Sequence, residues 1–332
     1  MNIIMAGIDY TMAGIDIREK FSFTKSCQQT IYECIKKNKA VLGAVIVSTC
    51  NRTEIYLSCV PGYSENPFAL LCQYAGINFK DYALLHRVRA GEEVFRHLCQ
   101  LACGAKSQIW GEDQIISQVK DSLAFARENQ ATDSYLEVLF RTAITAAKRI
   151  KTEIKFSQAD NSVALKTLTV LNRQPIRPHK VLVIGNGEVG RLVAHTLVAN
   201  GYAVTMTLRQ YKHGQVQVPA GVAVIDYADR YRHMAEFDAV VSATLSPHFT
   251  IEKDKLAGLP QVPRVMIDLA VPRDIDVSIQ ELANVALYDI DTIGRDTITE
   301  NHTKQMAEIN KIIDKYLNDF LKWKKYKELA SL

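Results

Sequence analysis

Cys50 is the residue of this sequence best suited to nucleophilic chemistry. It lies in Ser48-Thr49-Cys50-Asn51-Arg52, directly after an apolar, β-branched run. A positive charge two residues away, on Arg52, favours the thiolate form of a cysteine. A thiolate attacks acyl esters, and the thioester that it forms accepts a hydride more readily than a carboxylate does. The pattern supports a hypothesis of acyl transfer followed by reduction. The alternative is that Cys50 is a small buried core residue.

A glycine-rich turn is the second candidate site. Gly185, Gly187 and Gly190 form a GxGxxG pattern. Glu188 and Val189 lie between the last two glycines. The turn follows the apolar run VLVIG and opens the helical stretch RLVAHTLVANG, which is the context of a dinucleotide-binding loop. Backbone N–H groups at the start of that helix would hold a pyrophosphate. A glycine turn without a ligand is the alternative.

Residues at the ends of later predicted strands indicate which dinucleotide binds. Where an NAD site usually has an acidic residue, the sequence reads Thr207-Leu208-Arg209-Gln210, with Lys212 nearby. An arginine there suits the 2′-phosphate of NADP, so we expect NADPH as the cofactor. A solvated surface arginine is the alternative. Asp268 and Pro272 follow another predicted strand, as a cofactor contact or as a structural loop.

Two α/β domains are predicted to position these residues. Before residue 60, short apolar runs predict strands, with Cys50, Asn51 and Arg52 in the turn between two of them. Helical periodicity follows from Gly91 to Ile154. Later apolar runs are typical of buried parallel strands that alternate with helices. The expected fold class is α/β, with an N-terminal α+β catalytic domain (1–160), a doubly wound Rossmann-type NADP-binding domain (161–290) and a long C-terminal helix (291–332).

Composition limits the class of protein. Hydrophobic residues make up 48% and charged residues 23%, as in globular proteins. The net charge of +4 is too small to predict a nucleic-acid binder by itself. The seven cysteines lack the spacing of zinc ligands, so we expect free thiols and no metal. No apolar run reaches the roughly 18–20 residues of a membrane span and no signal peptide is visible, so we expect a cytoplasmic protein.

The stretch STCNRTEIY, which contains Cys50, resembles the catalytic signature of the glutamyl-tRNA reductase family. That family makes glutamate-1-semialdehyde from glutamyl-tRNA, at the start of tetrapyrrole (haem and sirohaem) synthesis. Further segments resemble the family in the same order over nearly the whole chain: GIDYTMAGIDIREKFSF, RHLCQLACGAKSQIWGEDQIISQVK, AAKRIKTE, VLVIGNGEVGRLVA, MIDLAVPRDID and NVALYDID.

The resemblance implies a role for each matching residue. Cys50 would attack the ester of glutamyl-tRNA, release the tRNA and hold a glutamyl thioester for reduction by NADPH. Arg52 would pair with the substrate carboxylate. His97 would be the active-site histidine, as a proton donor or an orienting group. The other residues of the glutamate pocket would be Thr49, Asn51, Ser107, Glu112 and Gln114. The backbone cradle near the nicotinamide would be Ser242, Ala243 and Thr244.

The sequence departs from the family pattern in several places. Asp9-Tyr10 stands where the family usually has Asn-His. Gln100 replaces an arginine, Lys106 an acidic residue and Gln108 an apolar one. A helical dimerisation domain follows the long helix in the family, and no counterpart is present in this sequence, which leaves a homodimer open. The resemblance also implies a partner, an aminomutase that accepts the semialdehyde.

Two other functions stay open from the sequence. A paralogue with the same fold and thiol would reduce another activated acyl group or another tetrapyrrole-related substrate, which the changed charges at Gln100 and Lys106 favour. A non-catalytic nucleotide sensor is the third possibility. The set of Cys50, Arg52 and His97 argues against a sensor, because a sensor has no use for a nucleophile.

Overall fold

The computed structural model of the chain describes residues 2–156, 162–209, 217–294 and 300–330. The chain divides into two units, Met1–Gln158 with Asp296–Leu332 and Ala159–Arg295. Each unit has its own sheet and its own hydrophobic core. Within the described residues, no helix combines the length and the apolar content that crossing a bilayer requires.

The first unit is built on a four-stranded antiparallel sheet. Its strands are β1 (Asn2–Asp9), β2 (Val41–Thr49), β3 (Arg52–Cys59) and β4 (Arg87–Ala90), in the order β2-β3-β1-β4. Cys50 and Asn51 form the tight turn between β2 and β3, as expected. Arg52, however, is the first residue of β3, because it pairs with Thr49 on β2 and Asp9 on β1.

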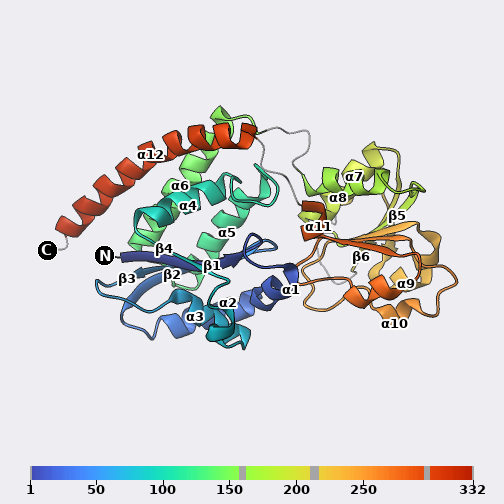
Figure 1. The fold of residues 1–332 in the computed structure, drawn as a ribbon, viewed down its shortest axis with the longest axis horizontal. Coiled ribbons are helices and arrows are strands. Elements are labelled where there is room, and N and C mark those ends of the chain that lie inside the picture. The colour runs from blue at the N-terminus through green and yellow to red at the C-terminus, as the bar shows by residue number, and fades with distance from the viewer. Residues whose placement is uncertain (1, 157–161, 210–216, 295–299, 331–332) are drawn as a thin grey trace. The chain divides into compact units, whose positions relative to one another are not determined.

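Helices cover both faces of this sheet (Figure 1). The helices are α1 (Ile15–Arg18), α2 (Lys25–Ile35), α3 (Pro67–Ala75), α4 (Glu92–Ala102), α5 (Gln114–Glu128) and α6 (Ser134–Glu153). Helix α2 contacts β2, and α3 contacts β1 and β3. Helix α4 contacts β1 and β4, α6 contacts β2 and β3, and α5 contacts β2. Their apolar residues recur at helical spacing and bury one side of each helix, and polar N-caps such as Thr24 and Asp133 begin two of them.

The end of the sequence returns to the first unit. The helix α12 (Glu300–Leu329) packs along α4 and α6, and buries Ile309, Ile313 and Phe320 (Figure 1). A single long helix was expected from residue 291. The structure instead has a short helix α11 (Ile290–Gly294) in the second unit, which ends at a glycine, a poor helix former. Residues 295–299 lie outside the described part.

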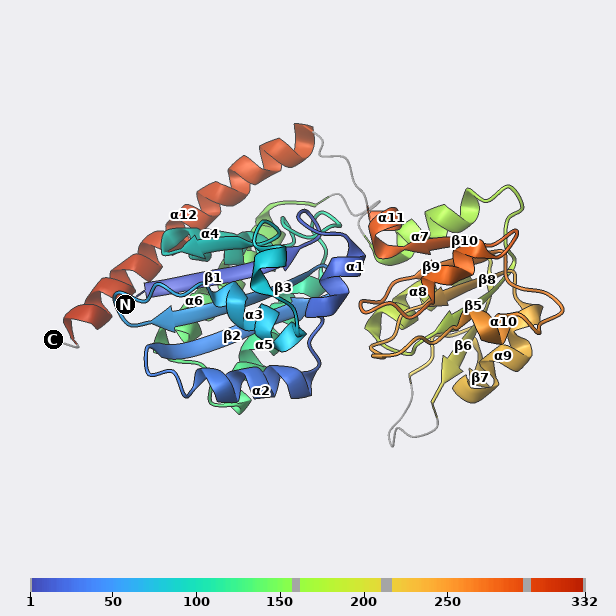
Figure 2. The same ribbon diagram turned by 60° about the horizontal axis from the view of Figure 1, so that its bottom comes forward.

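The second unit contains a six-stranded sheet whose neighbouring strands are all parallel (Figure 2). Its order, β10-β9-β8-β5-β6-β7, is that of a doubly wound Rossmann fold, which confirms the predicted fold class. The order reverses between β5 and β8, so ligands are expected there at the carboxyl ends of the strands. The strands are β5 (Lys180–Ile184), β6 (Ala203–Leu208), β7 (Ala223–Asp226), β8 (Ala239–Ser242), β9 (Val265–Asp268) and β10 (Ala286–Asp289).

The glycine turn lets a helix begin directly above the central strand of this sheet. A Cβ on Gly190 would lie 2.0 Å from the carbonyl oxygen of Gly185, so only glycine permits this packing. Gly185 itself has φ of 110°, which favours glycine. The helix that follows the turn is α8 (Glu188–Ala199), and the other helices of the unit are α7 (Val163–Asn172), α9 (Arg230–His233), α10 (Lys253–Leu256) and α11.

Candidate active site

A buried row of polar side chains crosses one face of the first sheet. Side chains two residues apart on β3 point to the same face, which brings Arg52, Glu54 and Tyr56 together. Arg52 Nη1 lies 2.8 Å from Glu54 Oε1 and 3.7 Å from Asp9 Oδ2. Glu54 Oε2 accepts a hydrogen bond from the Tyr56 hydroxyl at 2.5 Å, and His97 Nε2 on α4 lies 2.9 Å from Glu54 Oε1. This row is a connected charged network under the turn that carries the thiol.

The network fixes the protonation of His97. Burial opposes a charge on Glu54, but His97 and Arg52 outweigh that effect and hold the pKa of the carboxyl well below its usual value. Burial lowers the pKa of His97, although Glu54 opposes this. A neutral His97 therefore donates through Nε2–H to the carboxylate. Its buried Nδ1 has no hydrogen-bond partner among the described residues, and is left as an acceptor.

Cys50 is half-buried at the tip of the β2–β3 turn. Burial raises the pKa of its thiol to about 12, Glu112 adds to this effect, and Arg18 and Arg52 oppose it only in part. The thiolate expected from the sequence is therefore not the resting form. Burial is the main cause, and Arg52 lowers the pKa of the thiol only slightly because its charge is paired with that of Glu54.

The loop between α4 and α5, residues 103–113, contacts the charged network of the site. Arg52 Nη2 donates a hydrogen bond to the carbonyl oxygen of Lys106 in this loop. Lys151 on α6 holds the other end, because its Nζ donates to the carbonyl oxygens of Gly111 and Glu112, each at 3.1 Å. Gly111 has φ of 77°, and a Cβ there would overlap the ring of a phenylalanine. A specific loop conformation therefore places Glu112 near Cys50.

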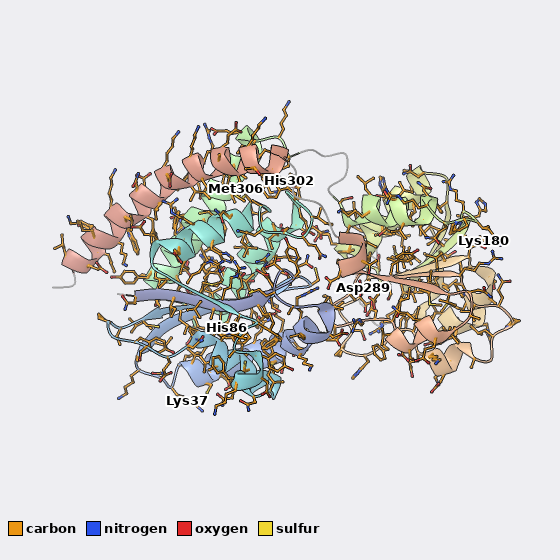
Figure 3. All side chains as sticks on the ribbon, viewed as in Figure 1. Lys37, His86, Lys180, Asp289, His302 and Met306 are labelled. Atoms are coloured by element: carbon orange, nitrogen blue, oxygen red, sulfur yellow. The ribbon has the colours of Figure 1, made fainter. Side chains whose placement is uncertain are left out.

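The last helix also supports this loop. Trp110 Nε1 donates to Gln305 Oε1 at 2.8 Å, and the indole stacks on the His302 ring with centroids 4.6 Å apart. His302 and Met306 lie one turn apart on α12 (Figure 3), and Met306 packs against the core of the first unit. The loop is thus held by α6 on one side and by α12 on the other.

The structure gathers most of the residues predicted to line the substrate pocket. Thr49 Oγ1 accepts from the Asn51 backbone N–H at 3.2 Å, in the turn that carries Cys50. Asn51 is 6% exposed, and its Oδ1 has no partner among the described residues. The Ser107 side chain is buried and forms a hydrogen bond with Glu112. Gln114 is half-buried as the first residue of α5.

Among the residues that depart from the family pattern, Tyr10 and Lys106 lie at this site, and Gln100 does not. The Tyr10 hydroxyl donates to the carbonyl oxygen of Ser107 at 3.2 Å. Lys106 is partly buried, and burial together with nearby arginines lowers the pKa of its ammonium group. The Gln100 side chain donates to Asn310 Oδ1 on α12 at 2.9 Å. The change at Gln100 therefore concerns the packing of α12 rather than the pocket.

The second unit holds a pocket of about 350 Å³ around the glycine turn. A Cβ on Gly187 would meet nothing within 4 Å, so the backbone there is open to an approaching phosphate. The Arg209 guanidinium lies 4.4 Å from the Tyr227 ring centroid. The pocket is lined by Gly185, Asn186, Gly187, Thr207, Leu208, Arg209, Tyr227, Ala243, Thr244, Leu245, Ser246 and Pro247. A glycine cradle beside an arginine fits a phosphorylated dinucleotide.

The remaining cofactor candidates take different positions. Glu188 and Val189 form the first turn of α8, while Ala243 and Thr244 line the pocket. Ser242 does not line the pocket, because it ends β8 and is completely buried beneath the loop that follows. Lys212 lies outside the described residues.

Three residues that support the two sites were not singled out from the sequence: Glu54, Lys151 and Asp274, whose carboxylate accepts a hydrogen bond from Ser242 at the end of β8. Glu54 could have been found, because it lies two residues after Arg52 on a predicted strand and so shares its face. Lys151 and Asp274 carry no such signal. Their partners are carbonyl oxygens and hydroxyls of loops more than 25 residues away along the chain, and periodicity says nothing about such contacts.

In comparisons with known proteins, a separate family model matches each of the two units. The family model of the glutamyl-tRNAGlu reductase N-terminal domain matches residues 6–154, and that of shikimate/quinate 5-dehydrogenase matches residues 165–295. The glutamyl-tRNA reductase of Alkaliphilus oremlandii is 52% identical over 329 residues, which cover 99% of this chain and 98% of that protein. The glutamyl-tRNA reductase of Acetivibrio thermocellus is 53% identical over 328 residues, with the same coverage. The structure of glutamyl-tRNA reductase from Methanopyrus kandleri matches with a TM-score of 0.51 and 26% identity, over 99% of this chain and 82% of that one.

Proposed function

We propose, since this chain belongs to the glutamyl-tRNA reductase family, that it reduces glutamyl-tRNA to glutamate-1-semialdehyde with NADPH, through a thioester on Cys50. The reaction is the first step of tetrapyrrole synthesis. One observation carries the role of Cys50: it is a half-buried thiol at the tip of a turn, above a buried network of polar side chains.

The first step is attack of the Cys50 sulfur on the ester carbonyl. A C–S bond forms, the ester C–O bond breaks, and the 3′-hydroxyl of the tRNA leaves with a proton. The thiol must lose its own proton as it attacks, because its pKa is raised to about 12. Glu112 is the carboxylate that acts most strongly on this thiol, and burial raises the pKa of Glu112 as well. We therefore assign Glu112 as the acceptor of the thiol proton.

The glutamyl group would be held by Asn51 and Arg52. The buried Oδ1 of Asn51 has no partner among the described residues and suits the α-ammonium group of the substrate. The Arg52 guanidinium would pair with the substrate carboxylate. Asp9 is its more distant partner, at 3.7 Å compared with 2.8 Å for Glu54. A substrate carboxylate would therefore replace Asp9, while Glu54 keeps Arg52 in place.

The second step is reduction of the thioester. The residues around the glycine turn would hold NADPH, which would supply the hydride that reduces the thioester carbonyl. The C–S bond then breaks, the sulfur of Cys50 takes up a proton, and the aldehyde is released. Arg209 supports the choice of NADPH, because its guanidinium lines the pocket where a 2′-phosphate would lie. His97, with an open acceptor at Nδ1 and an Nε2–H held by Glu54, would accept a hydrogen bond from a donor group of the substrate, or take up a proton there and pass it to the reacting group. Because the aldehyde product is reactive, we propose as the partner an aminomutase that accepts it.

A single-turnover reaction tests the proposal. Excess protein is mixed with charged glutamyl-tRNA and NADPH, and deacylation, NADPH oxidation and aldehyde are followed for the wild type, Cys50→Ser and Cys27→Ser. Cys27 is a matched control, since it is also a half-buried free thiol. We expect about one aldehyde per substrate from the wild type and from Cys27→Ser, and none from Cys50→Ser.

Two outcomes would contradict the proposal. A wild type that neither deacylates glutamyl-tRNA nor oxidises NADPH has a different substrate. A Cys50→Ser variant that still forms aldehyde at the wild-type rate uses a different nucleophile. NADPH binding by Cys50→Ser, followed by fluorescence, shows that the variant is folded in either case.

A further inference from the structure

A buried carboxylate supports the loop that closes the dinucleotide pocket. Asp274 is completely buried, and both its oxygens accept hydrogen bonds from the end of β8. Oδ2 accepts from the Ser242 hydroxyl at 2.7 Å and from the Thr244 backbone N–H at 2.8 Å. Oδ1 accepts from the Thr244 hydroxyl at 2.5 Å. Three donors converge on one carboxylate, an arrangement that fixes the direction in which the chain leaves β8.

A second buried carboxylate holds Asp274 in turn. Asp268, the last residue of β9, accepts from the backbone N–H groups of Asp274 and Ile275 through Oδ2, at 2.9 and 2.8 Å. Its Oδ1 accepts from the Ala270 N–H at 3.0 Å. Asp268 fixes the backbone position of residue 274 through these hydrogen bonds. The side chain of Asp274 in turn fixes the loop that follows β8.

The loop that Asp274 fixes forms one wall of the pocket. Residues 243–247 line it, and the Thr244 hydroxyl, besides donating to Asp274, accepts from the Ser246 N–H at 3.0 Å. The loop also packs on the opposite wall, because a Cβ on Gly185 would lie 2.4 Å from the carbonyl oxygen of Ala243. A shift at Thr244 would therefore change the width of the pocket at the glycine turn.

We propose that Asp274 is a positioning residue for the dinucleotide, which sets cofactor affinity through Thr244 without contacting the cofactor. The inference rests on the proposed function only in taking this pocket as the NADPH site. Asp274 does not line the pocket, so it acts on the cofactor through the loop, and its charge also interacts with that of Arg209. Loss of its hydrogen bonds should weaken NADPH binding, while the thiol chemistry of the first unit continues.

The experiment compares Asp274→Asn, Asp274→Ala and Thr244→Val with the wild type. NADPH dissociation constants come from fluorescence titration, and folding is followed by thermal denaturation. Asp276→Asn is the matched control, because this nearby acid on the same segment accepts hydrogen bonds from Ser278 instead. We expect the dissociation constant to rise about tenfold in Asp274→Asn, more in Asp274→Ala and several-fold in Thr244→Val, because a hydrogen bond to a charged group is lost or weakened. Asp276→Asn should bind as the wild type does.

If Asp274 only stabilised the fold, its substitution would not raise KM for NADPH while leaving kcat unchanged. We expect KM for NADPH to rise in Asp274→Asn with kcat little changed at saturating NADPH, and Cys50-dependent deacylation of glutamyl-tRNA to keep its rate. If Asp274→Asn does not fold, Ser242→Ala decides, because Ser242 donates to Asp274 and does not line the pocket, so weaker NADPH binding in this variant must come from the Asp274 contacts. Wild-type affinity in the folded variants would overturn the inference. A wild type that does not bind NADPH would overturn the proposed function instead.

Discussion

Cys50 carries a proton at neutral pH, because burial raises the pKa of its thiol to about 12 and Glu112 opposes a second negative charge nearby. With that pKa, almost every Cys50 thiol is protonated at pH 7. A protonated thiol is a poor target for oxidants and alkylating reagents. The nucleophile is therefore protected until a substrate brings its ester into reach, and the proton acceptor becomes part of the mechanism.

The pH dependence of alkylation tests this protonation state. Without substrate, we expect the rate at which iodoacetamide modifies Cys50 to rise about tenfold per pH unit between pH 7 and 10, because only the thiolate reacts. A pKa near 12 means that the thiolate fraction is still rising throughout this range. Mass spectrometry of the peptide that contains Cys50 measures the rate separately from the other cysteines.

Glu112→Gln sharpens the same measurement. Loss of the carboxylate lowers the pKa of the thiol, so at pH 8 the variant should be alkylated several-fold faster than the wild type. Asp113→Asn is the matched control, because Asp113 is an adjacent acid paired with Lys151 and largely exposed. A rate that levels off below pH 9 in the wild type would show that the thiolate is stabilised after all.

The sequence indicates the identity of the reactive residues better than their partners. The motif around Cys50 predicted the turn and the neighbouring guanidinium, and both are present. It could not show that Arg52 is committed to Glu54 and to the carbonyl oxygen of Lys106, 54 residues later. That second contact depends on how the loop of residues 103–113 folds, which depends in turn on Lys151.

At the scale of elements, the glycine turn and α8 depend on two glycines for different reasons. Gly190→Ala would place a Cβ 2.0 Å from the Gly185 carbonyl oxygen, so α8 must move away from β5. We expect a loss of about 1–3 kcal/mol in the free energy of unfolding of the second unit. Gly187→Ala meets open space, so its free energy of unfolding should change by less than about 0.5 kcal/mol.

Cofactor binding separates the two glycines further. A methyl group on residue 187 would lie where a pyrophosphate approaches the backbone, so Gly187→Ala should weaken NADPH binding at least tenfold while remaining stable. Thermal denaturation and NADPH fluorescence on both variants give the two quantities. Wild-type affinity in Gly187→Ala would mean that phosphates do not bind at this turn. Equal loss of stability in both variants would contradict the packing argument.

Buried strands were easier to predict from the sequence than exposed strands. The runs that became β5, β8 and β9 are nearly all apolar, and each is buried in the sheet. β4 and β7 lie at sheet edges, and most of their residues are exposed or half-buried. Their sequences, RVRA and AVID, are only four residues long, which is too short for an alternating or apolar pattern to mark a strand.

At the scale of the whole chain, the two units have separate cores. The core of the first unit includes residues of α12, although almost 150 residues separate that helix from the end of α6. The core of the second unit is made from its own strands and helices. The apolar stripe of α12 was visible in the sequence, but periodicity alone could not say whether it packs within the chain or against another subunit.

Separate cores predict two unfolding transitions, each sensitive to a different change. Ile313 on α12 is completely buried in the first core, so Ile313→Ala should cost about 2–5 kcal/mol there. The transition of the first unit should then move down by several degrees. NADPH should raise the transition of the second unit alone, because a ligand stabilises the fold that binds it.

Differential scanning calorimetry of the wild type and Ile313→Ala, each with and without NADPH, separates the two effects. Lys311→Ala is the matched control, since Lys311 lies on the same helix and is exposed. Its transitions should stay within about a degree of the wild type. If Ile313→Ala and NADPH instead shift one common transition, the two cores unfold together. The stability of α12 would then be coupled to NADPH binding. A change in either would alter the position of the loop that α12 supports, and with it the surroundings of Cys50.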